Sequence, residues 1–193
     1  MVENEEKQIS DFDTFPQITP AKIYFHEVLT KLMEKTAFFQ GLAKEIVAKS
    51  LQKIREVPEG VVLIEENSRK CDFFYLLLKG KLGVYEGNVK LTEITGTQIF
   101  GEIGFFNGKR IATVQTEEKS YVAQITQEFI NELDPKVQAV FYRNIASELS
   151  TKVSTSNEKY SSMVKYTGKK ATDLAKKTER IAEHVHFDII RNL

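Results

Sequence analysis

The residues best suited to bind a ligand lie in one segment, Phe100–Val114, which combines glycines, one carboxylate and a basic pair. Gly101 and Gly104 would let main-chain N–H groups approach a ligand closely, and a helical turn starting there would direct free N–H groups at an anion. The fork of Arg110 suits a phosphate, and the carboxylate of Glu102 suits the hydroxyls of a sugar. The segment therefore predicts a phosphate cradle, with a simple loop ion pair between these two side chains as the alternative.

The order of these residues resembles the phosphate-binding cassette of the cyclic nucleotide-binding domain family, in which Phe-Gly-Glu opens the cassette and Arg-x-Ala-Thr-Val closes it. Similarity continues in the right order across residues 29–165, including Val57–Gly60 and Phe74–Gly80. The family includes catabolite activator protein-like and protein kinase A regulatory subunit-like members. The resemblance implies an α+β fold, in which an eight-stranded β-roll, a double-stranded jelly-roll barrel, is flanked by N-terminal helices and a long C-terminal helical segment.

The resemblance also assigns roles to single residues. It implies that Glu102 bonds the ribose 2′-hydroxyl and that Arg110 neutralises the cyclic phosphate. The rest of the predicted ligand-binding set supplies main-chain groups or an apolar wall, and comprises Gly101, Ile103, Gly104, Ile111, Ala112, Val62, Leu63 and Leu82. Two departures concern the cassette: Arg110 follows Glu102 after eight positions, at least one fewer than usual, and Lys109 replaces a proline that often precedes the arginine.

The choice of nucleotide depends on Ile111. In relatives that prefer cGMP, a threonine or serine in this place bonds the guanine amino group, and Ile111 has no polar side-chain atom. We therefore expect cAMP, with cGMP left open, because one hydrogen bond discriminates by only about 0.5–1.5 kcal/mol. In the helix after the roll, which resembles the dimer helix of the catabolite activator protein family, Thr155, Ser156 and Asn157 either reach the base or form a solvated turn.

Composition limits the other classes of function. The 193 residues contain 27 Lys plus Arg and 27 Asp plus Glu, so no overall field attracts nucleic acid or an anionic membrane. A single cysteine, an acidic start and the lack of a long apolar run predict a cytoplasmic protein without membrane contact. No activated nucleophile, paired carboxylates or metal-ligand cluster stands out, so we expect no enzyme activity, no metal and no cofactor other than the ligand.

The chain is predicted to have three parts. Residues 1–20 form an acidic mobile tail, residues 21–127 hold the N-terminal helices and the β-roll, and residues 128–193 form C-terminal helices that supply hinge, lid and dimer contacts. The predicted N-terminal helices span 21–35 and 43–55. The predicted strands are Val61–Ile64, Phe73–Leu78, Lys81–Tyr85, Val89–Ile94, Ile111–Thr116 and Tyr121–Ile125.

Asp134-Pro135 is typical of the start of a long helix. Beyond it, a stripe with alternating spacings of four and three residues predicts a partner helix, and therefore a homodimer; its members are Leu149, Val153, Ser156, Tyr160, Met163 and Thr167. After an extra step across Gly168 the stripe resumes, so the helix either continues or folds back there.

Two functional hypotheses follow. In the first, a non-enzymatic regulatory module binds a cyclic nucleotide, repositions its C-terminal helices and signals to an effector protein. In the second, the chain is a nucleotide-free scaffold or interaction protein that keeps the roll, as the shortened cassette allows. Because little chain follows the dimer helix, we expect no winged helix-turn-helix and no sequence-specific DNA binding.

Overall fold

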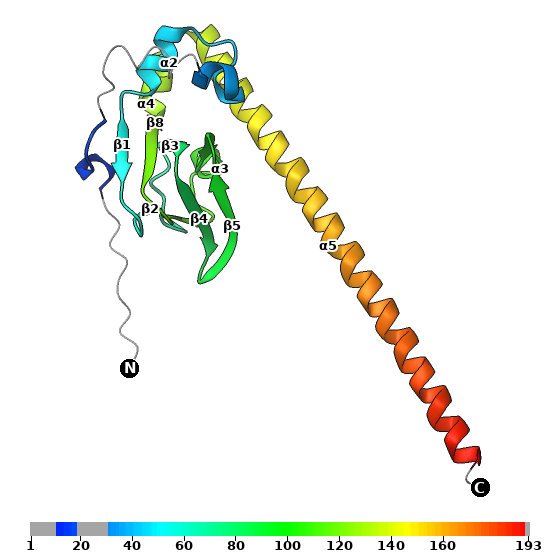
Figure 1. The fold of residues 1–193 in the computed structure, drawn as a ribbon. Helices are drawn as coiled ribbons and strands as arrows, with labels where there is room; N and C mark the ends of the chain where they lie inside the picture. The colour runs from blue at the N-terminus through cyan, green and yellow to red at the C-terminus, as the bar shows by residue number, and fades with distance from the viewer. Residues whose placement is uncertain (1–10, 19–30, 192–193) are drawn as a thin grey trace, which may run out of the picture. The chain divides into compact units, whose positions relative to one another are not determined.

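The computed structural model describes residues 11–18 and 31–191, and the chain divides into two compact units, Met1–Glu148 and Leu149–Leu193 (Figure 1). The helical elements are η1 (Phe12–Thr14), a turn of helix over residues 31–35, η2 (Ala37–Phe39), α2 (Lys44–Ser50), α3 (Glu102–Asn107), α4 (Gln127–Asn131) and α5 (Pro135–Arg191). The strands are β1 (Ile54–Val57), β2 (Val62–Ile64), β3 (Phe73–Lys79), β4 (Lys81–Glu86), β5 (Val89–Thr95), β6 (Gln98–Phe100), β7 (Thr113–Thr116) and β8 (Ser120–Thr126).

The strands form two four-stranded antiparallel sheets, ordered β1-β8-β3-β6 and β2-β7-β4-β5. Alternate side chains turn into the core, which includes Val57, Leu63, Tyr75, Leu77, Leu82, Phe100, Val114 and Val122. Gly80 makes the turn from β3 to β4 with φ +119°, where a Cβ would lie 2.2 Å from the hydroxyl of Ser120, so only glycine fits. The predicted α+β fold with an eight-stranded β-roll is confirmed.

Two strands, β1 and β6, were not predicted from the sequence. The predicted helix 43–55 is wrong beyond Ser50, because Ile54–Val57 forms β1 and pairs with β8 through Ile54 and Ala123. The pairing partner of β1 lies far along the chain, and this tertiary contact outweighs the local helical pattern. The other missed strand, β6, is three residues long and gives a correspondingly weak signal.

Residues 11–18 pack on the roll, although the sequence placed them in a mobile tail without core residues. Phe12 is buried in the core cluster, and Gln17 forms an isolated antiparallel bridge with Arg55 of β1. This segment, dark blue in Figure 1, lies beside β1. The prediction is therefore wrong for residues 11–18, because one aromatic side chain and an exposed strand edge hold an otherwise acidic segment; residues 1–10 lie outside the described part.

Helix α5 begins as predicted, with the N–H of Lys136 donating to Asp134 Oδ1 at 2.9 Å. Its first turns pack on the roll through Phe141 and Ile145, and Asn144 Nδ2 donates to the main-chain oxygens of Phe38 and Gln40, each at 2.8 Å. The predicted set of C-terminal helices is thus α4 and one long helix.

In the second unit α5 is continuous through Gly168, and apart from the neighbouring helix backbone no atom of the described residues lies within 4 Å of a Cβ built at this glycine. The hydroxyl of Thr172 donates to the main-chain oxygen of Gly168 at 3.0 Å, which places Gly168 inside a regular helical turn. The helix therefore continues at Gly168 and does not fold back.

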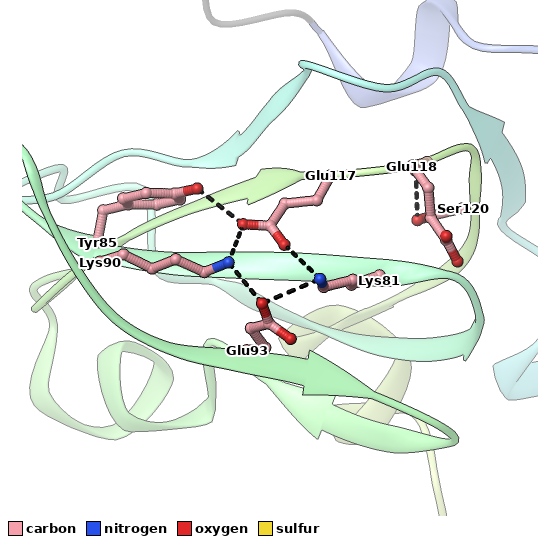
Figure 2. A network of polar contacts seen from close by, with 7 residues as sticks. All are labelled: Lys81, Tyr85, Lys90, Glu93, Glu117, Glu118 and Ser120. Carbon is pink, nitrogen blue, oxygen red and sulfur yellow. Dashed lines mark hydrogen bonds and ion pairs between the residues drawn. The ribbon is translucent and has the colours of Figure 1, made fainter.

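Five polar side chains form a network on the outer face of the second sheet (Figure 2). Glu117 accepts hydrogen bonds from Tyr85 at 2.9 Å and Lys90 at 2.5 Å, and Lys81 lies 3.3 Å away. Glu93 forms ion pairs with the same two lysines, with Lys81 at 2.9 Å and with Lys90 at 2.6 Å. Lys90 and Glu93 belong to the edge strand β5 and Glu117 follows β7, so the network ties the edge strand to the sheet.

Glu117 is expected to make stability depend on pH. Its hydrogen bonds, from Lys90 above all and then from Tyr85, lower the pKa of Glu117 from 4.5 to about 2. Because the folded state binds this proton less readily than the unfolded chain, the stabilisation is complete above about pH 4.5 and disappears as the pH falls to about 2. Urea denaturation should show that Glu117→Gln is less stable than the parent at neutral pH, and that this difference shrinks in acid. A difference that is constant with pH would contradict the assignment.

Candidate functional site

The segment predicted to bind phosphate connects β6 to β7. Gly101, with φ +80°, ends β6 and is the N-cap of α3, so the predicted helical turn is present. The helix ends at Gly108, with φ +70°, whose N–H donates to the Gly104 oxygen at 2.9 Å. Only Lys109 stands between this cap and Arg110, and its side chain is exposed. The start of the cassette therefore forms a regular helical turn, and a single residue connects the C-cap of this turn to Arg110.

The two glycines at the start of the cassette make room for the arginine side chain. A Cβ at Gly101 would lie 2.6 Å from Ile64 Cδ1 and 3.0 Å from Arg110 Nη1, and one at Gly104 would lie 2.7 Å from Arg110 Cδ. At these distances a side chain at either glycine would force Ile64 or Arg110 to shift. From the sequence, we predict that these glycines let a ligand approach the main chain closely. In the structure they also make room for the side chain of Arg110.

Arg110 is 2% exposed and is held by main-chain oxygens. Nε donates to Lys70 at 3.0 Å, Nη1 to Gly101 at 2.5 Å and Nη2 to Phe73 at 2.8 Å, and the guanidinium carbon lies 4.7 Å from the centre of the Phe73 ring. Among the contacts seen for the described residues, these three bonds use three of the five guanidinium N–H groups, which leaves one on each terminal nitrogen. Burial lowers the pKa of Arg110, but an arginine stays charged at neutral pH.

The main chain of Arg110 is also fixed. Its N–H donates to the oxygen of Ser68 and its oxygen accepts from the N–H of Asn67, both at 2.9 Å. The loop between β2 and β3 therefore holds both the backbone and the side chain of the arginine. Sequence reasoning missed this loop, and the only local signal is Asn67, a residue type that tolerates the left-handed region and has φ +67° here.

The other predicted residues fall into three groups. Glu102 is the first residue of α3 and is 2% exposed. The predicted wall residues Val62, Leu63 and Leu82 are buried in the roll, whereas Ile103 and Ile111 are exposed and Ala112 is half-buried. Thr155, Ser156 and Asn157 lie on α5 in the second unit with exposed side chains, and their participation stays a prediction.

The sequence model of the cyclic nucleotide-binding domain matches residues 54–134, which contain all eight strands and the cassette. These residues belong to the cyclic nucleotide-binding domain family. The domain begins at β1 and ends just before α5. The family membership expected from the cassette is therefore confirmed. No curated protein sequence matches the chain.

Solved structures share the fold of this domain. A cyclic nucleotide-binding domain from Methylobacillus flagellatus KT is 18% identical, with a TM-score of 0.62 over 75% of this chain and 86% of that chain. The catabolite activator protein of Thermus thermophilus is 20% identical, with a TM-score of 0.55 over 64% and 61% of the two chains. A putative cyclic nucleotide-binding protein from Geobacter metallireducens GS-15 is 21% identical, with a TM-score of 0.53 over 64% and 96%. The match covers less than two-thirds of the Thermus protein.

In the part of the chain that the structure describes, no helix is both long and apolar enough to cross a membrane. The same residues contain no group of three or more His, Cys, Asp or Glu side chains that could hold a metal ion.

Proposed function

We propose that the chain is a regulatory module that binds a cyclic nucleotide, cAMP in preference to cGMP, at the cassette. Arg110 carries this proposal: it is a buried cation whose three hydrogen-bond acceptors are neutral carbonyl oxygens. Those bonds orient the guanidinium without cancelling its charge, and an N–H on each terminal nitrogen remains for an anion. A cyclic phosphate has one negative charge and suits this arrangement.

The remaining contacts are assigned by position in the cassette. Glu102 would accept a hydrogen bond from the ribose 2′-hydroxyl. Main-chain groups and apolar side chains around the ligand would come from Gly101, Ile103, Gly104, Ile111, Ala112, Val62 and Leu82, with Ser156 and Asn157 reaching the base. No metal or further cofactor is part of this proposal, and the module is not an enzyme.

A chain of aromatic contacts supports transmission from the cassette to α5. Phe105 of α3 lies 5.3 Å from Phe74, which lies 5.8 Å from Phe38, and Phe38 lies 5.5 Å from Phe141 of α5. Packed rings have few alternative arrangements, so a shift of α3 on ligand binding would bias the first turns of α5. The ligand must bind one arrangement more tightly for this to act as a switch.

The exposed stripe on α5 supports a homodimer. Val153, Tyr160 and Met163 are 58%, 68% and 64% exposed, and they keep the alternating spacing of a coiled coil. A second copy of α5 would cover these side chains, and light scattering of the full chain tests this expectation. In the proposed setting, a cytoplasmic dimer would pass the nucleotide signal to an effector protein.

Isothermal titration of the full chain with cAMP and with cGMP tests the proposed function. We expect saturable binding of both nucleotides with cAMP the tighter. The alternative function, a nucleotide-free scaffold, is supported by the shortened cassette, and it would be favoured if neither nucleotide bound at concentrations near 1 mM, the weak end of specific binding at about −4 kcal/mol.

Ile111→Thr should raise cGMP affinity by up to about tenfold, the size of one well-placed hydrogen bond. Ile111 is 55% exposed at the end of the cassette, so the smaller polar side chain should not disturb the core. Binding of cAMP should change little. Competition titrations of parent and variant measure the ratio of the two affinities. An unchanged ratio would mean that selectivity is set elsewhere, for which Thr155, Ser156 and Asn157 are the candidates.

A further inference from the structure

The N-terminal strap, which we define as residues 11–18, extends the first sheet at its edge. The N–H of Ile18 donates to the oxygen of Ile54, and the N–H of Glu56 donates to the oxygen of Pro16, each at 3.1 Å. These bonds use main-chain groups that an edge strand otherwise leaves unpaired. The strap is therefore docked on β1 by backbone pairing, independently of its acidic composition.

One side chain of the strap enters the core and begins a series of contacts that ends at the cassette. The ring of Phe12 lies 5.1 Å from the ring of Tyr75, and Tyr75 lies 5.1 Å from Phe73. The Arg110 guanidinium carbon lies 4.7 Å from the centre of the Phe73 ring. Three aromatic rings thus connect the strap to the cation that is proposed to bind phosphate.

Docking of the strap also includes an unfavourable contribution to the free energy. Arg55 Nη2 lies 3.2 Å from Asp13 Oδ1, and the two side chains are 10% and 58% exposed. Within the described part of the chain, Arg55 Nε and Nη1 are buried without a hydrogen-bond partner. Burying unpaired donors costs free energy, which offsets part of the gain from Phe12. The docked and released states of the strap are therefore closer in free energy than the buried ring alone would suggest.

We propose that the strap is a positioning element for the cassette. When Phe12 is docked, it holds Tyr75 and Phe73, and Phe73 in turn keeps the guanidinium of Arg110 against its carbonyl acceptors. Release of the strap loosens this series, and Arg110 leaves the arrangement that favours an anion. The effect on nucleotide affinity rests on the proposed function, whereas the effect on Arg110 does not.

Hydrogen exchange of the full chain tests the strap without any ligand. Phe12→Ala should speed exchange of the Ile18 N–H, which reports docking, and of the Arg110 Nε–H, which donates to Lys70. We expect both rates, followed by NMR, to rise about 2- to 30-fold, the range typical of coupling between sites. Val47→Ala, which removes a buried side chain of α2 outside the ring series, is the control for general destabilisation.

The two reporters separate the outcomes of the exchange experiment. Faster exchange at both sites in Phe12→Ala, beyond the change in Val47→Ala, supports the proposal. If the Ile18 N–H exchanges faster while the Arg110 Nε–H keeps its parental rate, the strap does not position Arg110 and the proposal is overturned. Equal changes in the two variants would also overturn it, because they would reflect stability alone.

A double-mutant cycle tests the consequence for affinity. Phe12→Ala and Phe73→Leu should each weaken cAMP binding by about 2- to 30-fold, and the double variant should lose little more than Phe73→Leu alone, because both act through one series. Losses that simply add would refute the series. A parent that binds no cAMP would refute the proposed function, and the exchange experiment would still decide the role of the strap.

Discussion

Arg110→Ala is expected to weaken cAMP binding by about 2–5 kcal/mol, roughly 30-fold to several thousand-fold, because the phosphate loses the cation that faces it in a buried site. The same substitution removes three hydrogen bonds to main-chain oxygens: two join the cassette to β3 and to the preceding loop, and the third lies within the cassette. We therefore also expect a lower free energy of unfolding, with the roll still folded. Titration with cAMP gives the first quantity and urea denaturation gives the second.

Two variants separate charge from geometry at this position. Arg110→Lys keeps the positive charge but lacks the planar fork, so its affinity should fall between those of the parent and Arg110→Ala. Lys109→Ala changes the exposed neighbouring cation and should bind cAMP within about threefold of the parent, as expected for a screened surface charge. If folded Arg110→Ala binds cAMP as tightly as the parent, the cassette is not the site.

Phe38→Ala should lower the free energy of unfolding by about 3–5 kcal/mol, the usual effect of emptying an aromatic core position. Phe38 is fully buried, and its ring centre lies 5.0 Å from Phe39, 5.8 Å from Phe74 and 5.5 Å from Phe141. The loss should also loosen the contact between the roll and the first turns of α5. Urea denaturation of the full chain measures the first effect.

Phe106→Ala provides the matched control, because this phenylalanine is 51% exposed and its ring centre lies 5.3 Å from Phe105 and 6.2 Å from Tyr142, at the edge of the aromatic contacts. We expect it to cost about 1 kcal/mol or less. The two variants remove the same atoms, so the difference between them measures burial. Equal losses in the two variants would show that Phe38 does not hold the group together.

The cassette could be predicted from the sequence because its function depends on side-chain types at fixed spacing. Glu102, Arg110 and the two glycines are such residues, and the family match over residues 54–134 confirms the domain that they indicate. The structural role of Gly101 and Gly104 could be predicted only in part. Their closest neighbours include atoms of Arg110, and a contact with the side chain of a later residue cannot be deduced from the spacing alone.

The groups that hold Arg110 could not be predicted, because main-chain oxygens leave no pattern in the sequence. Lys70 and Phe73 contribute through their carbonyl groups, and almost any residue type could do so. The same limit applies to β1, whose partner lies on β8, and to Phe12, whose acidic neighbours predicted a tail. In each case a contact between distant parts of the chain outweighed the local composition.

The order of strands in the two sheets has a consequence for how the chain acquires its fold. Strand β1 pairs with β8, and β2 pairs with β7. Each of these N-terminal strands can therefore pair only after a strand much later in the sequence has been synthesised. Among the described strands, only β4 and β5 pair as neighbours in sequence, and this hairpin closes across the short turn at Gly87. During synthesis this hairpin can form first, whereas the two sheets close only after β8 has left the ribosome. Such non-local pairing slows folding and prolongs the exposure of apolar strands to other chains.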